Sequence, residues 1–332
     1  MAGAALTLAL VAPTLGACTS GGEDRLVVYS GRTENLVGPL LEDFAEESGI
    51  SIDVRYGDSA DLALLVDEEG DRSPADVFIS QSPGAVGFLD TAGRLTGLPD
   101  DLVGLVPEGD AAADNTWVGL SGRVRTLVYN PDLVDPATLP DSVLDLTGPA
   151  YAGDVAMAPT NGSFQDFVTI LRSELGDDEA RAWLDGMAAG DPPTFDNNTA
   201  IVEAVGRGEV PMGLVNHYYA LRARAEDPDL PVENHFFPEG DLGSTLLVTA
   251  ASIVEGTDKA DDAEALVEFL LSEEAQGFFS DETFEYPLAS GAAPNEALPP
   301  FEEISSTQVD LDELGGGLAA TTEMIDQSGL NR

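Results

Sequence analysis

The side chains best suited to binding a ligand lie in the stretch Asn216-His217-Tyr218-Tyr219, where two adjacent tyrosines follow the apolar run 210–215. The run predicts a buried strand that turns directly into a helix, with Asn216 as its N-cap. Both tyrosines then fall in the first helical turn, where unpaired N–H groups and the helix dipole favour negative charge. Two phenolate oxygens at such a position suit a hard, highly charged cation such as ferric iron.

A second interpretation of the pair stays open, because adjacent tyrosines are often packing residues with a hydroxyl at the surface. Other candidates are few: His217 and His235 are expected to pack, and two histidines with one cysteine do not make a zinc site. The sequence contains no G-x-S-x-G motif, P-loop or Ser-His-Asp spacing. It therefore predicts a binding protein and not an enzyme.

The composition excludes several classes of partner. Of 332 residues, 61 are acidic and 14 are basic, and the formal net charge is −47. This charge repels nucleic acid and anionic lipid headgroups. It is spread along the chain and indicates a solvated surface adapted to high salt, where screening weakens self-repulsion. With 43% hydrophobic residues, the chain can form two domains with cores of their own.

The single cysteine, Cys18, excludes an intrachain disulfide. Residues 3–17 are apolar or small, and Leu15-Gly16-Ala17-Cys18 resembles the lipobox of bacterial lipoproteins, although no basic residue precedes the run. The resemblance implies cleavage before Cys18, a lipid on its sulfur and a short polar tether. We therefore expect a protein anchored to the outer face of the cell membrane through lipidated Cys18, with no membrane-spanning segment in the mature chain.

Strand and helix patterns alternate along the chain, which predicts an α/β fold of mostly parallel sheets flanked by helices. The predicted strands are 26–29, 50–56, 75–80, 117–122, 125–129, 155–157, 210–215 and 244–254. The predicted helices are 34–48, 61–69, 83–92, 163–175, 178–189, 199–206, 261–271, 273–280 and 318–327. Gly49 should end the first helix, and Asn198 or Thr199 should cap the helix at 199–206.

Ligands of open α/β sheets bind beyond the carboxyl ends of the strands. The loops that follow predicted strands in this way are 30–33, 80–82, 160–163 and 216–219. The run Ser121-Gly122-Arg123, between two predicted strands, would be a hinge between lobes, and the strand 244–254 would be the return crossing. Two lobes joined in this way can close on a ligand by hinge motion.

Five stretches, in order, resemble the periplasmic ferric-iron-binding proteins of bacterial ABC importers. They are 28–32, 69–78, 120–125, 216–219 and 285–288, and the resemblance extends over most of residues 25–330. It implies a two-lobed type II periplasmic binding protein, with hinge crossovers between the lobes, that captures iron and delivers it to a membrane permease.

The resemblance also implies roles for single residues. The iron-binding tyrosines of the family fall on Tyr218 and Tyr219. The positions that hold a synergistic oxyanion, such as carbonate, phosphate or citrate, fall on Asn216, Asn198, Gly162 and Ser163. Arg123 and Arg32 lie in expected cleft loops, where they would neutralise the charge of the anion. For Arg32, a surface ion pair with one of the many carboxylates is an equal alternative.

The sequence departs from the family pattern in the first lobe. Thr33 and Gln81 stand where well-studied members carry a histidine and a glutamate, and neither residue is a good ligand for ferric iron. Together with Thr160, they are candidates only for lining the cleft. The chain would then complete the coordination with water or an anion, or bind a ferric chelate. The alternative is that the same scaffold binds a metal-free organic or phosphate anion.

The expected organisation assigns residues 1–24 to the lipoprotein signal and tether. The N-terminal lobe would contain residues 25–123 and the return segment 247–290. The C-terminal lobe would contain residues 124–246, with residues 291–332 packing on it. The expected partners are an ABC permease and a metal or small-molecule ligand, and the protein should be a monomer that touches the membrane only through its lipid.

Overall fold

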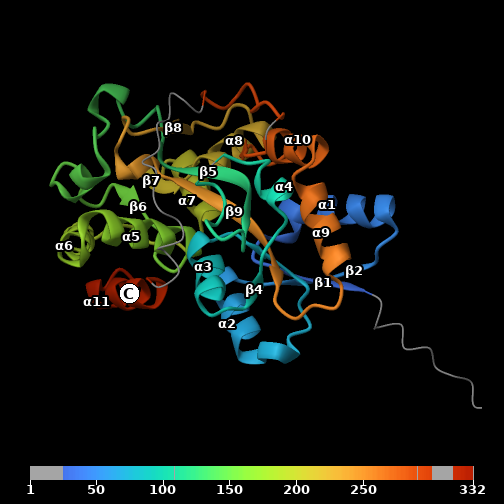
Figure 1. Cartoon of the computed structure of the whole chain (residues 1–332). Helices are drawn as coiled ribbons and strands as arrows, with labels where there is room; N and C mark the ends of the chain where they lie inside the picture. The colour runs from blue at the N-terminus through green and yellow to red at the C-terminus, as the bar shows by residue number, and fades with distance from the viewer. Residues whose placement is uncertain (1–24, 108, 290, 301–316, 332) are drawn as a thin grey trace, which may run out of the picture.

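The computed structural model describes residues 25–107, 109–289, 291–300 and 317–331 (Figure 1). Cys18 and its lipobox lie outside the described residues, as does most of the Gly315-Gly316-Gly317 stretch. The chain folds into two groups of strands and helices, which are joined by two long strands that run between them. The strand order is β2-β1-β3-β9-β5-β7-β6.

The first group is a parallel three-stranded unit with helices on both faces, as predicted. Its elements are β1 (Leu26–Ser30), α1 (Glu34–Ser48), β2 (Ile52–Tyr56), α2 (Ser59–Glu69), β3 (Val77–Ser80) and α3 (Pro83–Thr91). Helix α1 has the predicted bounds because Leu36, Leu40 and Phe44 recur on one buried face. It ends at Gly49, whose φ of 75° lies in the left-handed region that glycine tolerates.

Further short elements complete this group. They are β4 (Leu95–Thr96), α4 (Asp100–Val103), α9 (Ala260–Leu270), α10 (Glu273–Asp281) and β10 (Tyr286–Pro287). Helices α1, α9 and α10 cover one face of the sheet, and α2 and α3 cover the other. Among the described residues, no helix is both long and apolar enough to cross a bilayer.

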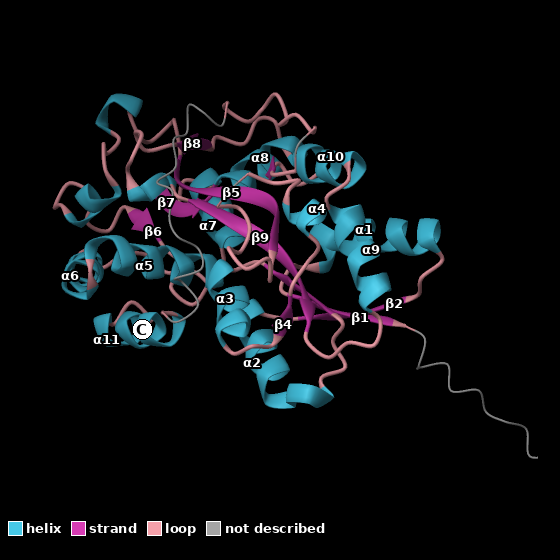
Figure 2. Cartoon of the chain, in the orientation of Figure 1, coloured by secondary structure: helices cyan, strands magenta, loops and turns pink. Residues whose placement is uncertain are grey.

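The two long strands are β5 (Val118–Tyr129) and β9 (Leu246–Val254). The prediction of two strands at 117–122 and 125–129 is wrong: β5 is continuous, with only a register shift between Gly119 and Ser121. Its first half pairs with β9, and its second half pairs with β7 (Met212–Asn216) and β8 (Glu233–His235). These pairings are antiparallel, so both sheets are mixed where the long strands enter them (Figure 2).

The second group is built on β6 (Val155–Ala156) and β7, which are parallel. Its helices are α5 (Gly162–Leu175), α6 (Asp177–Ala189), α7 (Asn198–Gly206), α8 (His217–Glu226) and α11 (Leu318–Ser328). Asn197, and not Asn198 or Thr199, caps α7: its side chain accepts the N–H of Ala200. Helix α11 packs against α5 and α6, where the Thr169 and Thr321 hydroxyls lie 2.8 Å apart.

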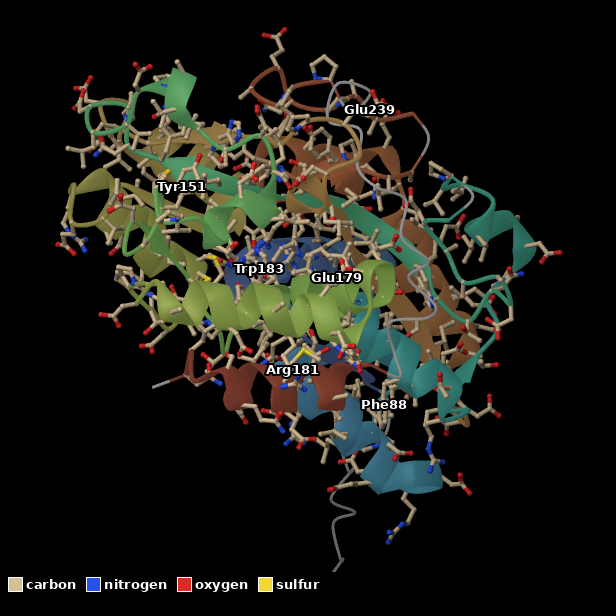
Figure 3. The ribbon with its side chains drawn as sticks, turned by 90° about the vertical axis from the view of Figure 1, so that its left-hand side faces the viewer. Phe88, Tyr151, Glu179, Arg181, Trp183 and Glu239 are labelled. Carbon is tan, nitrogen blue, oxygen red and sulfur yellow. The ribbon has the colours of Figure 1, made fainter. Side chains whose placement is uncertain are left out.

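Trp183 fixes the position of α5, whose first turn will matter for the site. The indole lies on α6, faces the interior and packs against Phe164 and Phe167 with ring centroids 6.4 and 5.6 Å away (Figure 3). Its Nε1–H donates to the carbonyl of Val143 at 3.0 Å. That carbonyl belongs to a 3-10 helix at Val143–Thr147.

We expect Trp183→Ala to lower the free energy of unfolding by about 3–5 kcal/mol, because it opens a cavity behind α5 and leaves a buried carbonyl unpaired. Urea denaturation followed by circular dichroism measures the loss. Leu133→Ala is the matched control, since the Leu133 side chain is 56% exposed and its truncation should change stability by less than about 0.5 kcal/mol. Equal effects of the two substitutions would contradict this packing.

Candidate functional site

Three arginines are buried together around the middle of β5. Arg123 and Arg125 are two residues apart on this strand and therefore point to the same face. Arg32 reaches them from the loop after β1. All three side chains are at most 1% exposed. Burying a guanidinium is costly unless it is paired and hydrogen-bonded, so three in one place indicate a site and not ordinary core packing.

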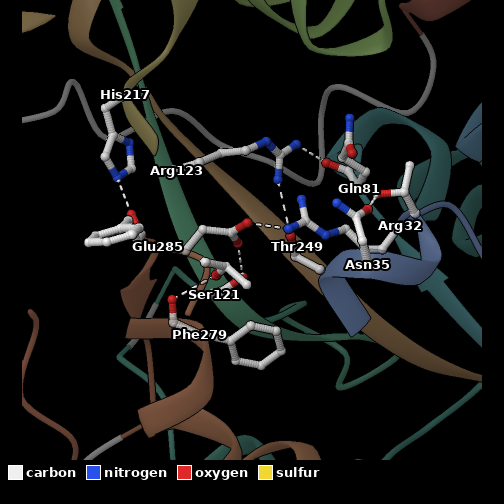
Figure 4. Close-up of polar contacts among 12 residues, drawn as sticks. Arg32, Asn35, Gln81, Ser121, Arg123, His217, Thr249, Phe279 and Glu285 are labelled. Atoms are coloured by element: carbon white, nitrogen blue, oxygen red, sulfur yellow. Dashed lines mark hydrogen bonds and ion pairs between the residues drawn. The ribbon is translucent and has the colours of Figure 1, made fainter. Parts of the chain in front are cut away.

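Arg32 forms a buried ion pair with Glu285, and neither side chain is exposed (Figure 4). The other carboxylate oxygen of Glu285 accepts a hydrogen bond from the Ser121 hydroxyl. The alternative that Arg32 pairs with a carboxylate is therefore correct, but the ion pair lies in the interior and not at the surface. Nε and Nη1 of Arg32 have no protein partner. The sequence placed Glu285 only in a stretch of family resemblance and gave it no role.

Arg123 donates to the Thr249 hydroxyl at 3.2 Å and to the backbone carbonyl of Gln81 (Figure 4). Gln81 therefore enters the site through its main chain. Burial lowers the pKa of Arg123 below its ordinary value, and the nearby charge of Arg32 acts in the same direction. The prediction that Arg123 lies in a loop is wrong, because it lies within β5 and only its side chain reaches the loop after β3.

Arg125 is a site residue that the sequence interpretation missed. It donates to the Asn216 side-chain oxygen at 3.3 Å, to the Ser163 hydroxyl at 3.4 Å and to the carbonyl of Leu214 at 3.1 Å. Burial lowers its pKa to about 9, so it remains charged at neutral pH. The available signal was its spacing of two from Arg123 within an apolar strand of a chain with only 14 basic residues.

Tyr218 and Tyr219 lie in the first turn of α8 as predicted, and their rings stack with centroids 4.2 Å apart and planes 28° apart. Tyr218 is fully buried, and its hydroxyl has no protein partner. The Arg32 guanidinium carbon lies 5.9 Å from the centre of the Tyr218 ring. Burial raises the pKa of Tyr218 well above its ordinary value, although Arg32 and Arg123 oppose the shift.

The outer face of the tyrosine pair borders a cavity. Tyr219 is half-buried and lines a space of about 540 Å³ between α7, α8 and the start of α1. Asn35, Thr199 and Arg222 also line it. Tyr218 thus lies beside the buried arginines, and Tyr219, stacked on it, also borders a space large enough for solvent or a small ligand.

The prediction that the Asn216 side chain caps α8 is wrong. Asn216 occupies the N-cap position, but its side chain makes no capping bond and accepts from Arg125 instead. His217 packs as expected: Nδ1 accepts the N–H of Val124 at 2.9 Å, and Nε2–H donates to the carbonyl of Phe284 at 2.8 Å. Burial lowers the His217 pKa to about 4, so the ring is neutral at pH 7.

The first turn of α5 supplies polar groups from the opposite side. The Asn161 side chain caps the helix by accepting the N–H of Ser163 at 3.2 Å. The Asn198 amide nitrogen donates to Asn161 and to the Ser163 hydroxyl, both at 3.3 Å. Ser163 thereby links Asn198 to Arg125 in one network. Gly162 starts the same helix, and a Cβ there would lie 3.7 Å from Asp58 Oδ2.

Other candidates lie outside this network. Thr33 is exposed and donates to the Asn35 side chain at 2.6 Å, and Thr160 is exposed with its carbonyl accepting from Gln165 at 3.4 Å. His235 packs, as expected: its ring lies 5.1 Å from that of Phe237. Among the described residues, neither threonine side chain is hydrogen-bonded to the buried arginines or to Tyr218.

Asp166 is a second residue that the sequence did not single out, because carboxylates are too frequent in this chain to be diagnostic. It lies on α5, is 1% exposed, and accepts a hydrogen bond from the Ser82 hydroxyl through Oδ1. Oδ2 has no protein partner. Burial raises the Asp166 pKa to about 7. The contact joins the loop after β3 to the second group of elements.

Within the described part of the chain, every buried side-chain nitrogen or oxygen that lacks a protein partner belongs to this site. The atoms are Arg32 Nε and Nη1, Arg123 Nε, Arg125 Nε, Asp166 Oδ2, Asn198 Oδ1, Asn216 Nδ2 and Tyr218 Oη. Buried polar groups are normally satisfied, so such a cluster indicates a ligand. Most of these atoms are donors, which suits a ligand rich in oxygen acceptors.

The same described residues contain no group of three or more histidine, cysteine, aspartate or glutamate side chains that could hold a metal ion. A metal at this site would therefore depend on the tyrosine oxygens and on oxygens of a second ligand. The donor-rich surroundings fit that arrangement, because they can hold an oxyanion beside the tyrosines.

Comparison with known proteins agrees with this architecture. The chain is 30% identical over 329 residues to the major ferric iron-binding protein of Neisseria meningitidis, covering 97% of this chain and 98% of that one. The crystal structure of iron-bound HitA from Pseudomonas aeruginosa superposes with a TM-score of 0.88 at 31% identity, covering 92% and 99% of the two chains. A Trichodesmium protein solved with iron and citrate ligands is 25% identical, with a TM-score of 0.79 and coverage of 92% and 99%.

These neighbours have the two-lobed type II periplasmic binding protein fold that the sequence predicted, with β5 and β9 here running between the lobes. Residues 72–309 match the family described as bacterial extracellular solute-binding proteins. This match agrees with the prediction of a binding protein and not an enzyme. The chain belongs to the family of bacterial extracellular solute-binding proteins.

Proposed function

We propose that this protein captures ferric iron together with an oxyanion and delivers it to the permease of an ABC importer. The observation that carries the proposal is the stacked pair Tyr218 and Tyr219 facing a cluster of buried donors that lack protein partners. Relatives named or solved as ferric iron-binding proteins support the same cargo.

Tyr218 and Tyr219 would supply two phenolate oxygens to the metal. Stacking at 4.2 Å keeps the rings together, and both tyrosines lie in the first turn of α8, where backbone N–H groups have no acceptor within the helix. Buried Tyr218 does not ionise by itself, because burial raises its pKa. A trivalent cation would displace the proton, so the proposal requires the metal to generate the ligand that holds it.

The oxyanion would bind on the side of α5 and α7. Arg125, Asn216 and Ser163 already form one hydrogen-bonded network, and Asn198 joins it through Ser163. Gly162 allows the chain to approach closely, and Arg123 and Arg32 add positive charge. Carbonate, phosphate and citrate all fit this chemistry, because each offers several anionic oxygens to donors.

A second candidate function is binding of a metal-free organic or phosphate anion. The excess of donors among the unpartnered atoms favours it, as do Thr33 and Gln81 at positions where a histidine and a glutamate would supply metal ligands. Binding of a ferric chelate would combine the two proposals, because the ligand would contain both iron and an organic anion. The cavity of about 540 Å³ beside Tyr219 could hold the organic part of the chelate.

We further propose that the mature protein is a monomer anchored outside the cell membrane through lipidated Cys18. The lipobox-like sequence at 15–18 supports the anchor. Family membership supports the extracytoplasmic location and a permease as partner. The net charge of −47 supports contact with the membrane through lipid alone.

Titration of the apo protein with ferric citrate should produce a visible tyrosinate-to-iron charge-transfer band. Tyr218→Phe and Tyr219→Phe should each weaken the band and lower ferric affinity by at least about 100-fold, because each removes a metal ligand, and even supporting groups cost 10–100-fold. Tyr151→Phe is the control, since Tyr151 is not part of the hydrogen-bonded network of the site and its hydroxyl donates to the carbonyl of Thr138. A colourless wild type would contradict the proposed cargo.

Arg125→Lys should lower ferric affinity by about 10–100-fold at a fixed concentration of phosphate or carbonate, because lysine cannot reproduce the several hydrogen bonds of the guanidinium. Raising the anion concentration should recover part of the loss. Isothermal titration calorimetry with each anion measures both effects, and Arg94→Lys, at a half-exposed ion pair, is the control. If the anion concentration had no influence on either protein, the synergistic anion would be ruled out.

A further inference from the structure

Both oxygens of the buried Glu285 carboxylate are hydrogen-bonded to neighbouring side chains. One oxygen accepts from Arg32 and the other from the Ser121 hydroxyl. The backbone N–H of Glu285 donates to the carbonyl of Phe279 at 2.9 Å. A carboxylate held by a guanidinium and a hydroxyl, with no exposure to water, is fixed in its position beside Arg32.

The segment that carries Glu285 is tied to the tyrosine pair. Phe284, the residue before it, has a φ of 56°, a conformation that is costly for a bulky residue. Its carbonyl accepts from Nε2 of His217, and His217 directly precedes Tyr218. His217 also receives the N–H of Val124 on β5. Glu285 is therefore held in place through His217, the first residue of the helix α8 that also carries Tyr218.

The contacts close a ring. From Tyr218 it passes through His217 and Phe284 to Glu285, and from Glu285 through the ion pair to Arg32. Arg32 returns to Tyr218, with its guanidinium carbon 5.9 Å from the ring centre. Glu285 is thus paired with Arg32 (Figure 4), and Arg32 in turn lies beside the Tyr218 ring.

Charge explains why the position of Glu285 matters. The site buries three guanidiniums, and the buried carboxylates near them are Glu285 and Asp166, the latter with a pKa of about 7. With Glu285 ionised, the site carries between one and two excess positive charges. Without it, the excess would lie between two and three, which strongly favours an anion and repels a cation in a poorly screened interior.

We propose that Glu285 determines the specificity of the site, because by neutralising Arg32 it makes the site accept a highly charged cation with its anion instead of an anion alone. The effect on cation binding rests on the proposed iron-binding function. The effect on the binding of metal-free anions does not depend on that function. Glu285 would act through Arg32 and would not touch the ligand.

The test substitution is Glu285→Gln, which keeps the size and a hydrogen-bond acceptor for Arg32 but removes the charge. We expect ferric affinity to fall at least about 100-fold and the affinity for metal-free phosphate or citrate to rise about 10-fold, because the added net charge acts in opposite directions on the two ligands. Charge-transfer absorbance measures the first effect, and calorimetry without iron measures the second.

The double variant Arg32→Gln with Glu285→Gln separates electrostatics from structure. It removes both charges and restores the wild-type excess, so ferric affinity should return to within about 10-fold of wild type and the gain in anion affinity should disappear. A purely structural role predicts a further loss. Glu282→Gln is the matched control: it makes the same change of charge at an exposed residue three positions earlier and should alter neither affinity.

Three results would overturn the inference. They are unchanged affinities in Glu285→Gln, loss of both affinities in that variant, and failure of the double variant to restore ferric binding to a folded protein. Failure of the proposed function gives a different pattern. In that case the wild type binds no iron, yet Glu285→Gln still binds metal-free anions more tightly than the wild type does.

Discussion

The structure depends on keeping three guanidinium groups out of water around the middle of one strand. Each buried charge carries a desolvation cost of several kcal/mol that only close partners can offset. Arg32 pairs with a carboxylate, and Arg123 donates hydrogen bonds to a carbonyl and a hydroxyl. Arg125 donates to two side chains and a backbone carbonyl. Arg32 and Arg123 bond to residues of the first group and of β9, whereas Arg125 bonds to residues of the second group, so the arginine cluster lies where the two groups meet. The donors that stay unpartnered define what the ligand has to provide.

The interior of the site and the surface of the protein have opposite charge. The chain carries a formal net charge of −47, yet 3 of its 14 basic residues are buried at one place. A negative surface attracts cations from solution, while the buried guanidiniums attract anions at short range. A cation and an oxyanion bound together satisfy both, and neither alone does. Surface attraction weakens with salt, but the buried contacts are screened much less.

Much of the fold follows from the sequence because local signals agree with it. The spacing of Leu36, Leu40 and Phe44 and the glycine at position 49 give α1 its bounds. The polar run around Gly122 suggested a break in β5. The strand continues because the side chains of Ser121 and Arg123 form hydrogen bonds with Glu285 and Thr249, which lie far away in the chain. The N-cap of α7 was ambiguous because Asn197 and Asn198 are consecutive and asparagine is a favoured N-cap residue at either position.

The site could be predicted only in part. Tyr218, Tyr219 and Asn216 form a local pattern at a strand end, and sequence alone locates it. Arg125, Asp166 and Glu285 acquire their roles from contacts 38 to 253 residues apart, such as Arg125 with Ser163 and Arg32 with Glu285. No local periodicity encodes such pairings. In a chain with 61 acidic residues, two buried carboxylates also cannot be distinguished from the exposed ones by residue type.

The continuity of β5 and β9 has a mechanical consequence. Because the first half of β5 is paired with β9 and its second half with β7, any rotation of one lobe against the other must be absorbed as bending of the strands that link them. Arg123 and Arg125 lie at the middle of β5, where its pairing with β9 ends and its pairing with β7 begins. A bending strand would therefore move the groups proposed to hold the cargo, so that separating the lobes and releasing the ligand would be one motion.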